Sequence, residues 1–339
     1  MEYTKSKEAI IQELVSLCKV PGISGREELV REKIISLIGD TNYEVDNIGN
    51  LIVRKQSGIK SKNVILLAHM DEIGFYITGL RDDGKLEIRN VGGIIEDSIQ
   101  GSFVQVITQS GVIDGVIGTV PPHLKADGVT FDKCIDVGAK SKNELLSMGI
   151  SIMDYAVFRK EYAILNNDFL SIRSIDDRFG CYTLVEVMKS DILRANCTFA
   201  WTVQEEVGLK GAKALINRLS TFENSIYDLA IAVDSFACCS KQNKHIELGK
   251  GPVIRAYDNS SISDINIVKL LIKIADENGI PIQIGTTGGG NDASVFTDYG
   301  VPMIALSVPI RYLHSQVEML NIKDVLNLIK LIILFLSKF

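Results

Sequence analysis

Two patterns of apolar residues alternate along most of this chain. Short apolar runs rich in β-branched side chains are typical of buried β-strands, whereas apolar residues recurring every three or four positions are typical of helices. In the second half of the chain, helices are expected at 177–191, 208–220, 264–279 and 324–336, and strands at 198–204, 229–234 and 303–309. This alternation predicts an α/β domain with helices on both faces of its sheet.

The first seventy residues contribute further elements to the same sheet. An amphipathic helix is expected within 1–20. Ser24 stands three residues before Glu27, which is the spacing of a capping box and predicts the start of a second helix. The segment 44–57 predicts a pair of strands with a turn between them, and 63–70 predicts the first buried strand.

The middle of the chain has a different pattern, with short alternating segments separated by Gly, Asp and Ser. This pattern predicts a small β-barrel or sandwich. A helix is expected only near 141–150, where Ser141 could cap it and Glu144 complete the box. The expected domains are an α/β domain formed by 1–72 and 166–339, and an inserted β domain at 73–165.

Composition excludes several classes of function. The 339 residues suffice for two domains, and a net charge of −6 without a long basic tract makes nucleic acid an unexpected partner. Glu and Lys interrupt the stretch where a signal peptide would need an apolar core. The apolar segment 326–339 is too short to span a bilayer and contains Lys330, so we expect a buried closing helix and no membrane contact.

The cysteines favour a reducing compartment. None of the six forms a CxxC pair, and several lie within apolar segments, so buried reduced thiols in a cytoplasmic protein are expected. Cys238 and Cys239 follow a candidate metal ligand, Asp234, within a few residues. A direct metal role for this pair is disfavoured.

Residue types that bind metals stand where the predicted strands end. They are His69 and Asp71, Asp176 with Asp177 and Arg178, Glu205 and Glu206, Asp234, and His314. In open α/β sheets the carboxyl edge of the strands is where active sites form. Two His and several carboxylates without a nearby Cys suit a hydrolytic two-metal centre better than a structural zinc site.

Each of these motifs taken alone has a structural explanation. The His69–Asp71 pair could be an internally satisfied polar pair, Asp176 and Asp177 could cap a helix, and Glu205–Glu206 could be a solvated turn. Their joint occurrence, each after a buried strand, favours the metal centre.

Several segments together resemble one known family. They are AHMDEIGF, DDRFG, VQEEVGLKGA, AVD, TGGGNDAS and RYLHSQVEML, with GVIGTVPPH and GKGPVI elsewhere in the chain. These segments resemble the motifs of the tetrahedral aminopeptidases, the glutamyl-aminopeptidase/endoglucanase-like family of di-zinc metallopeptidases. The resemblance covers nearly the whole chain. It implies a mixed-sheet, di-zinc exopeptidase-type catalytic domain and an inserted small β-barrel.

The resemblance also implies a set of metal ligands. It places His69 and Asp234 on opposite metals, with Asp176 bridging both. Glu206 would join one metal and His314 the other. A carboxylate has two oxygens and can bridge ions about 3.5–4 Å apart, whereas His supplies one nitrogen to one ion.

The same resemblance implies the remaining roles. Glu205 would be the general base that takes a proton from a water activated by the metals, and Asp71 would orient His69. Gly289 and Gly290 would lie beside the substrate cleft. His123 is expected to be structural or to contact another subunit.

The implied function is removal of N-terminal residues from short peptides by a homo-oligomer, a dodecamer in this family, with Zn or Co as the expected metal. The preferred first residue stays open, since Arg255 could bind an acidic side chain or be a solvated charge. One alternative is a metal-dependent amidohydrolase acting on another acylated small molecule. An endo-1,4-β-glucanase is disfavoured because a glycosidase needs two carboxylates and no metal. A non-catalytic peptide-binding protein is disfavoured because the ligand set and Glu205 are complete.

Overall fold

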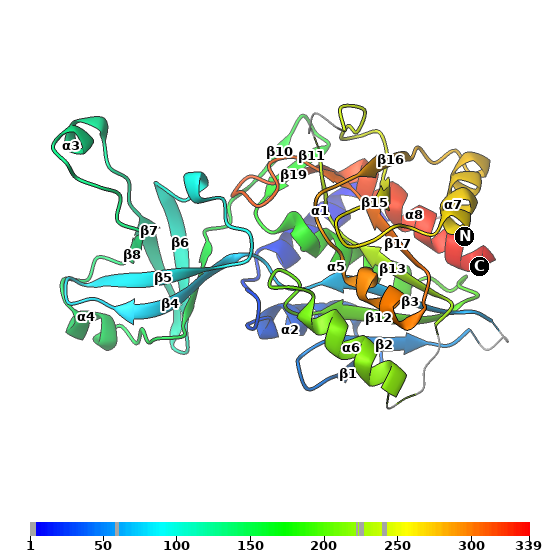
Figure 1. Cartoon of the computed structure of the whole chain (residues 1–339), viewed down its shortest axis with the longest axis horizontal. Helices are drawn as coiled ribbons and strands as arrows, with labels where there is room; N and C mark the ends of the chain where they lie inside the picture. The colour runs from blue at the N-terminus through cyan, green and yellow to red at the C-terminus, as the bar shows by residue number, and fades with distance from the viewer. Residues whose placement is uncertain (1–4, 58–60, 222, 224–226, 239–242) are drawn as a thin grey trace.

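The chain folds into an α/β unit from which a small β-barrel projects (Figure 1). The structure is a computed structural model that describes residues 5–57, 61–221, 223, 227–238 and 243–339. The α/β unit is built from the two ends of the chain, and the barrel from its middle. The C-terminus lies on the side of the α/β unit that faces away from the barrel.

An eight-stranded mixed sheet forms the centre of the α/β unit. In spatial order its strands are β1 (Glu44–Val45), β2 (Leu51–Lys55), β12 (Asn196–Thr202), β3 (Asn63–His69), β13 (Leu229–Val233), β17 (Met303–Ser307), β15 (Val253–Tyr257) and β16 (Gln283–Thr286). The four central strands, from β12 to β17, run parallel. Their carboxyl ends therefore meet at one edge, and the register pairs His69 with Thr202 there.

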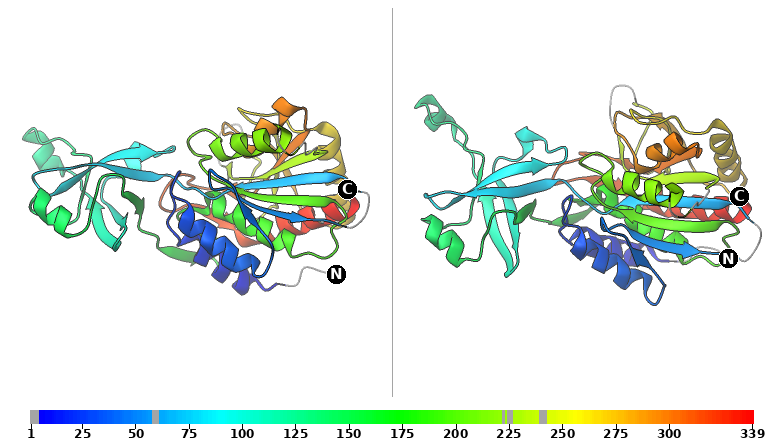
Figure 2. Two further views of the ribbon diagram at one scale, coloured as in Figure 1. Left: turned by 90° about the horizontal axis from the view of Figure 1, so that it is seen from below. Right: turned by 60° about the horizontal axis from the view of Figure 1, so that its bottom comes forward.

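Alternating side chains of β3 show why both faces of the sheet are covered. Leu66 points into one apolar cluster and Leu67 into another. The first face is covered by α1 (Lys7–Cys18), α2 (Glu28–Ile38), α5 (Ile175–Met188), α7 (Ile265–Glu277) and α8 (Ile322–Lys338). The second is covered by α6 (Lys210–Thr221) and the 3₁₀ helix η2 (Asp292–Tyr299). Figure 2 shows helices on both sides of the sheet, which confirms the predicted α/β class.

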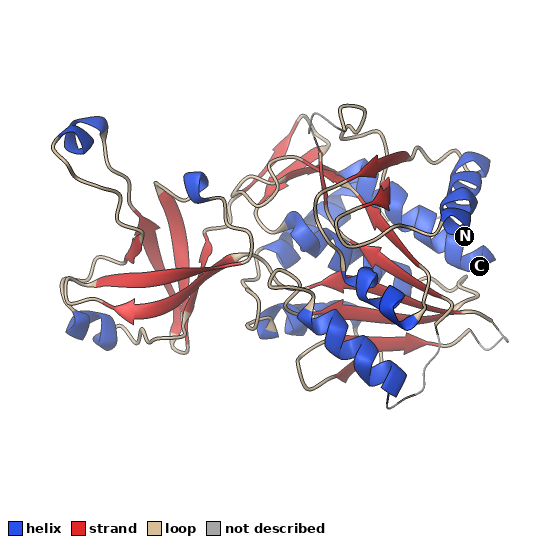
Figure 3. Cartoon of the chain, viewed as in Figure 1, coloured by secondary structure: helices blue, strands red, loops and turns tan. Residues whose placement is uncertain are grey.

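The barrel is closed and has a core of its own. Its strands follow the order β4 (Gly74–Leu80), β5 (Lys85–Val91), β8 (Cys134–Asp136), β7 (Gly111–Ile117), β6 (Ser102–Thr108) and β9 (Tyr155–Phe158). Phe75 and Phe158 meet edge to face inside it, with ring centroids 5.4 Å apart. Around it lie η1 (Glu96–Ser98), α3 (Pro122–Ala126) and α4 (Lys142–Ser147), and Figure 3 shows α3 at the end of a long loop. The Ser141 hydroxyl caps α4 by accepting from the Glu144 N–H at 3.3 Å, as predicted.

The segment 155–165 divides between the barrel and the α/β unit. Strand β10 (Tyr162–Leu165) pairs with β11 (Phe169–Ile172), which in turn pairs with β19 (Met319–Asn321). A further short pair, β14 (Phe236–Ala237) and β18 (Pro309–Ile310), lies in the same unit. The barrel strands themselves thus span residues 74–158.

The capping box predicted at Ser24 and Glu27 is wrong. Helix α2 begins at Glu28, and no side chain caps its first turn. Ser24 Oγ donates instead to Asp71 Oδ2 at 2.6 Å, and Glu27 Oε1 accepts the N–H of Gln204 at 3.0 Å. Distant buried partners replace the local ones, and the loop before α2 is bound to the carboxyl edge of the sheet.

Helix α8 is the buried closing helix that the sequence predicts. Ten of its residues are buried, among them Leu328 and Ile332. Within the described ranges, no helix combines the length and apolarity needed to cross a bilayer. The thiols of Cys18, Cys134, Cys181 and Cys197 are free and buried, whereas Cys239 lies outside the described residues.

Candidate metal centre

The candidate metal-binding residues gather at the carboxyl edge of the central strands. His69 is the last residue of β3, and Asp234 follows β13 directly. Asp176 lies at the start of α5 in an extended conformation, with φ −75° and ψ 109°. Together with loop residues they line a cavity of about 190 Å³. The lining residues are His69, Asp176, Glu205, Glu206, Asp234, Ser235, Ala237, Arg255, Thr287, Gly289, Gly290, Leu313 and His314.

The potential ligands form two groups that share Asp176. One group is His69, Asp176 and Asp234, and the other is Asp176, Glu206 and His314, with ligand atoms within 4.8 Å of one another in each. Asp176 Oδ1 lies 3.3 Å from His69 Nε2, and Asp176 Oδ2 lies 3.4 Å from His314 Nε2. Each oxygen of this carboxylate therefore faces a different group, as a bridging ligand requires.

This grouping corrects the predicted division of ligands between the metals. The resemblance implied that His69 and Asp234 hold opposite ions, but the structure places them in the same group. The physical reason is that β3 and β13 are adjacent parallel strands, so the residues that end them lie side by side. Glu206 and His314, which both come from loops, form the other group, with 3.5 Å between Oε1 and Nε2.

The residues fit two divalent cations of the Zn or Co type. Imidazole nitrogens and carboxylate oxygens are ligands that these ions accept, and each group supplies both kinds. The buried Asp176 Oδ1 has no hydrogen-bond partner among the described residues. A buried carboxylate oxygen without a partner is costly unless a cation or proton satisfies it.

Both histidines are oriented so that Nε2 faces the ligand groups. His69 Nδ1 lies 3.0 Å from the carbonyl oxygen of Asp71, and His314 Nδ1 lies 3.0 Å from that of Gly93. Because a carbonyl can only accept, Nδ1 carries the proton in both rings. Nε2 is then the ring atom that faces Asp176, and its lone pair would become available to an ion that displaces the proton from this nitrogen.

Asp71 organises the loop that carries the two glutamates. Its Oδ1 accepts the N–H of Glu205 at 3.0 Å, and its Oδ2 accepts the N–H of Glu206 at 3.1 Å. Oδ1 also lies 3.5 Å from His69 Nδ1. Gln204, at φ 56°, turns the chain just beyond β12, so Glu205 and Glu206 both reach the cavity. The predicted link between Asp71 and His69 is thus part of a larger set of contacts.

The pKa shifts show a cluster with more carboxyl groups than can all be ionised together. Burial raises the pKa of Glu205 well above its usual range, and that of Glu206 to about 7. Burial opposes protonation of His314, but Asp176 and Glu206 outweigh it and raise the pKa of this His to about 9. The acids share protons because they are close together in a poorly hydrated space. Divalent cations would displace these protons, since metal ligands bind in their deprotonated forms.

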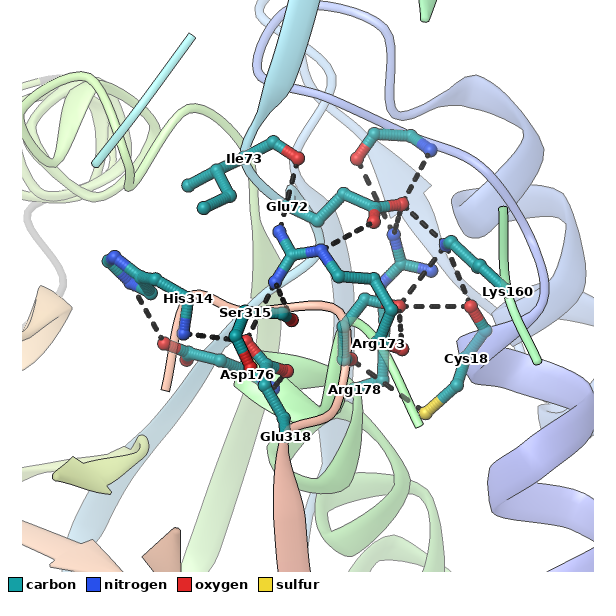
Figure 4. Close-up of polar contacts among 12 residues, drawn as sticks. Cys18, Glu72, Ile73, Lys160, Arg173, Asp176, Arg178, His314, Ser315 and Glu318 are labelled. Atoms are coloured by element: carbon teal, nitrogen blue, oxygen red, sulfur yellow. Dashed lines mark hydrogen bonds and ion pairs between the residues drawn. The ribbon is translucent and has the colours of Figure 1, made fainter. Parts of the chain in front are cut away.

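A buried ionic network holds the backbone of two candidate ligands (Figure 4). Glu318 Oε1 accepts the His314 N–H at 2.9 Å, and Oε2 accepts the Asp176 N–H at 3.3 Å. Arg173 Nη1 donates to Glu318 Oε1 at 2.7 Å, and its Nε lies 3.8 Å from Glu72 Oε2. Glu72 also pairs with Lys160 at 2.5 Å.

The sequence analysis missed this network. Glu72 and Glu318 each stand within four residues of a candidate ligand or its partner, and that proximity was the available signal. Arg178, in the Asp176-Asp177-Arg178 motif, lies 3.4 Å from Glu72 rather than in the cavity. Asp177 is also buried outside the cavity lining, and its Oδ2 accepts the N–H of His69 at 3.2 Å.

A glycine-rich turn held by Arg255 forms part of the cavity wall. Gly289 and Gly290 line the cavity, and Arg255 Nη1 donates to the Gly290 carbonyl at 2.8 Å. Arg255 also pairs with Asp258 at 3.2 Å, and lies 3.6 Å from Asp234 Oδ1. With 3 % of its side chain exposed, Arg255 is not the solvated charge that one alternative assumed.

The other two histidines that the sequence raised lie elsewhere. His123 is exposed in α3, on the loop that extends from the barrel, and is absent from the residues that line the cavity. His245 Nε2 lies 2.9 Å from the carbonyl oxygen of Ile284.

Comparison with known proteins places this centre in a family. The M42 glutamyl aminopeptidase family matches residues 49–331. The lysyl aminopeptidase of Pyrococcus furiosus is 32 % identical over 329 residues, which are 92 % of this chain and 92 % of that protein.

Two solved structures are similar over nearly their whole length. The TET1 peptidase of Pyrococcus horikoshii, described as assembling into a tetrahedron or a large octahedral shell, is 47 % identical, with a TM-score of 0.88 and coverage of 96 % and 98 %. An aminopeptidase of Desulfurococcus kamchatkensis is 31 % identical, with a TM-score of 0.91 and coverage of 98 % and 96 %. The chain therefore belongs to the M42 glutamyl aminopeptidase family of peptide-bond hydrolases, as its motifs predict.

Proposed function

We propose that this protein is a metal-dependent aminopeptidase that removes N-terminal residues from short peptides. The observation that carries the proposal is the position of Asp176, whose two oxygens face two separate groups of ligands. In this proposal His69, Asp176 and Asp234 hold one divalent ion, and Asp176, Glu206 and His314 hold the other. Zn and Co are the expected metals. Two such ions would lower the pKa of a water molecule and polarise the scissile carbonyl.

Glu205 is the proposed general base. It lines the cavity together with both ligand groups, and Asp71 holds its backbone N–H. Burial, with the nearby carboxylates of Asp234 and Asp292, raises the pKa of Glu205, while His69 opposes the shift. A raised pKa lets one carboxyl group accept a proton from water and later return it to the leaving amine. Divalent cations bound beside it would reduce this shift.

The size and charge of the cavity support action at the end of a peptide. Its volume of about 190 Å³ is small, since a cavity of roughly 150 Å³ is already filled by benzene. The carboxylates that line it would attract the cationic N-terminus of a peptide. Gly289 and Gly290 line the cavity with backbone that carries no side chain, so the substrate backbone could approach closely there.

The first experiment is hydrolysis of aminoacyl-p-nitroanilides carrying Glu, Asp, Leu, Lys or Ala, by the metal-loaded protein with and without chelator. Release that the chelator abolishes is the expected result, and the panel would identify the preferred first residue. No release from any substrate with either Zn or Co would refute the proposal in favour of another amide substrate. Release of sugar from a β-glucan in the presence of EDTA would favour the glucanase alternative.

The base assignment has its own test. Glu205→Gln keeps the shape of the side chain but cannot accept the proton, so turnover should fall roughly 10²–10⁴-fold while both metals still bind. Glu247→Gln, at an exposed glutamate, is the matched control. Activity of Glu205→Gln above a few per cent of the unmodified enzyme would exclude Glu205 as the base.

The inserted domain, residues 73–165, is proposed to mediate a homo-oligomeric assembly, which in analogy with the tetrahedral relative would be a dodecamer. Two observations support it: the barrel projects from the α/β unit, and it exposes several large apolar side chains. These are Phe103, Val112, Val116, Leu146, Ile152 and Met153. Light scattering should give the mass of a multimer, and a monomer at micromolar concentration would refute this part. We place the protein in the cytoplasm, in keeping with the free thiols of the buried cysteines Cys18, Cys134, Cys181 and Cys197.

A further inference from the structure

The inserted barrel reaches into the candidate metal centre. The loop that follows β5 carries Gly92 and Gly93, and the Gly93 carbonyl accepts the hydrogen bond from His314 Nδ1. The α/β unit supplies His314, whereas the barrel supplies the acceptor that fixes its ring. Residues 221 positions apart therefore meet at one candidate ligand.

Gly92 and Gly93 lie so close to the candidate ligands that a side chain at either position would crowd them. A Cβ added at Gly93 would lie 2.8 Å from His314 Nδ1 and 3.0 Å from its Cε1. A Cβ at Gly92 would lie 3.1 Å from Cβ and from Oε2 of Glu206. Gly92 has a φ of 74°, which itself favours glycine, whereas no such backbone restriction applies to Gly93. An alanine at position 93 would therefore act through its contact with the His314 ring.

Further contacts fix the barrel in place against this loop. Gln316, two residues beyond His314, donates from Nε2 to Ser102 Oγ of β6 at 2.5 Å. Arg173 Nη2 donates to the carbonyl of Ile73, where the chain enters the barrel, at 3.1 Å. Glu72 and Lys160, which flank the barrel in the sequence, form a buried ion pair with each other (Figure 4). The position of the barrel is thereby coupled to Glu318, which holds the His314 N–H.

We propose that the barrel is a working part of the metal centre, in which Gly93 positions His314 and so sets the affinity of the His314–Glu206 site for its ion. This inference rests on the proposed function, because it assumes that His314 and Glu206 bind a metal. It assigns the barrel a role beyond assembly. The His69–Asp234 site has no contact of this kind with the barrel among the described residues, so the two sites should respond differently when the barrel loop is altered.

The test is a calorimetric titration of the chelator-treated, full-length protein and its Gly93→Ala variant with Co²⁺ or Zn²⁺. The added Cβ should push the His314 ring away from the carbonyl that orients it, and disturbing the orientation of a ligand weakens metal binding by roughly 10–100-fold. We expect this loss at one of two sites, with the other unchanged. The visible spectrum of Co²⁺ gives a second readout, which should show one altered ion environment.

Gly118→Ala is the matched control, because a Cβ at Gly118 would meet no atom of the described residues within 4 Å. Ser102→Ala is a second test that adds no volume: it removes the contact with Gln316 and should weaken the same site by a smaller factor. If Gly93→Ala does not fold, Ser102→Ala decides the question. Wild-type affinity at both sites in each folded variant would overturn the inference. Failure of the unmodified protein to bind any metal would instead overturn the proposed function.

Discussion

Replacement of Asp71 by Asn tests how much one buried carboxylate contributes to the site. Asp71 is fully buried and its oxygens accept from Ser24 Oγ and from the N–H groups of Glu205 and Glu206. Burial opposes ionisation, but His69, Ser24 and the backbone donors outweigh it and lower the pKa of Asp71. The folded state therefore favours the charged form, which Asn cannot supply.

The cost follows from the hydrogen bonds that Asn can keep. Asn retains one oxygen, but its NH₂ group must face a backbone N–H that Asp71 now satisfies. An unsatisfied buried donor costs about 1–3 kcal/mol, and hydrogen bonds to a charged acceptor are worth about 1 kcal/mol more than those to a neutral one. The expected loss in the free energy of unfolding is about 2–4 kcal/mol. Binding of metal should weaken by roughly 10–100-fold.

Thermal unfolding of the chelator-treated protein measures the first effect. At roughly 1.4 °C per kcal/mol for a chain of 339 residues, the Tm should fall by about 3–6 °C. Asp276→Asn, at an exposed position in α7, is the matched control and should change stability by less than about 0.5 kcal/mol. A Tm for Asp71→Asn within about 2 °C of the unmodified protein, with unchanged metal affinity, would refute the reasoning.

The pH dependence of this variant has a definite sign. Because the folded-state pKa of Asp71 lies below the unfolded value of 3.8, the stabilisation by its charge is fully present above pH 3.8. It is lost as the pH falls from there through the folded-state pKa. The difference in stability between the unmodified protein and Asp71→Asn should therefore shrink on acidification below pH 3.8. A difference that grows in this range would contradict the assigned shift.

Two further predictions concern the buried network and the metals. Arg173→Met should lower the free energy of unfolding by about 3–5 kcal/mol, because it leaves buried Glu318 without its cation, and Arg173→Lys should lower it by less. Denaturant unfolding of both variants measures these losses. An Arg173→Met variant as stable as the unmodified protein would contradict the prediction. Zn or Co at about 100 times its dissociation constant should stabilise the folded chain by about 2.7 kcal/mol for each of the two proposed sites, and chelator should reverse the gain. An identical Tm with and without metal would contradict a centre that binds ions in the folded state.

The α/β class and the buried strands could be predicted because they depend on local patterns. The apolar run of β3 and the regularly spaced apolar residues of α8 can be recognised in the sequence without knowing which segments pack against them. The motifs around His69, Asp176 and Glu205 were equally visible in the sequence, because several acids and histidines that each follow an apolar strand together indicate a functional site. The structure brings all three residues into one cavity.

Predictions that required knowledge of distant partners failed or could not be made. Ser24 and Glu27 have the spacing of a capping box, yet they bind Asp71 and Gln204, which are closer to the site than to the helix. The division of ligands between the ions followed from the adjacency of β3 and β13, and strand order is not encoded in any local pattern. No local pattern marks Glu318 and Arg173 as buried residues, and only the fold places them together in the interior.

The sequence by itself determined which residues could perform chemistry and which segments would be strands or helices, because residue type and periodicity act over a few positions. Tertiary structure alone decided that His69 and Asp234 belong to the same ligand group, that Asp71 holds the glutamate loop, and that Gly93 of the barrel meets His314. Each of these depends on segments that are far apart in the chain. Their contact is set by the packing of the whole fold, in which burial favours conformations that give most polar groups a partner.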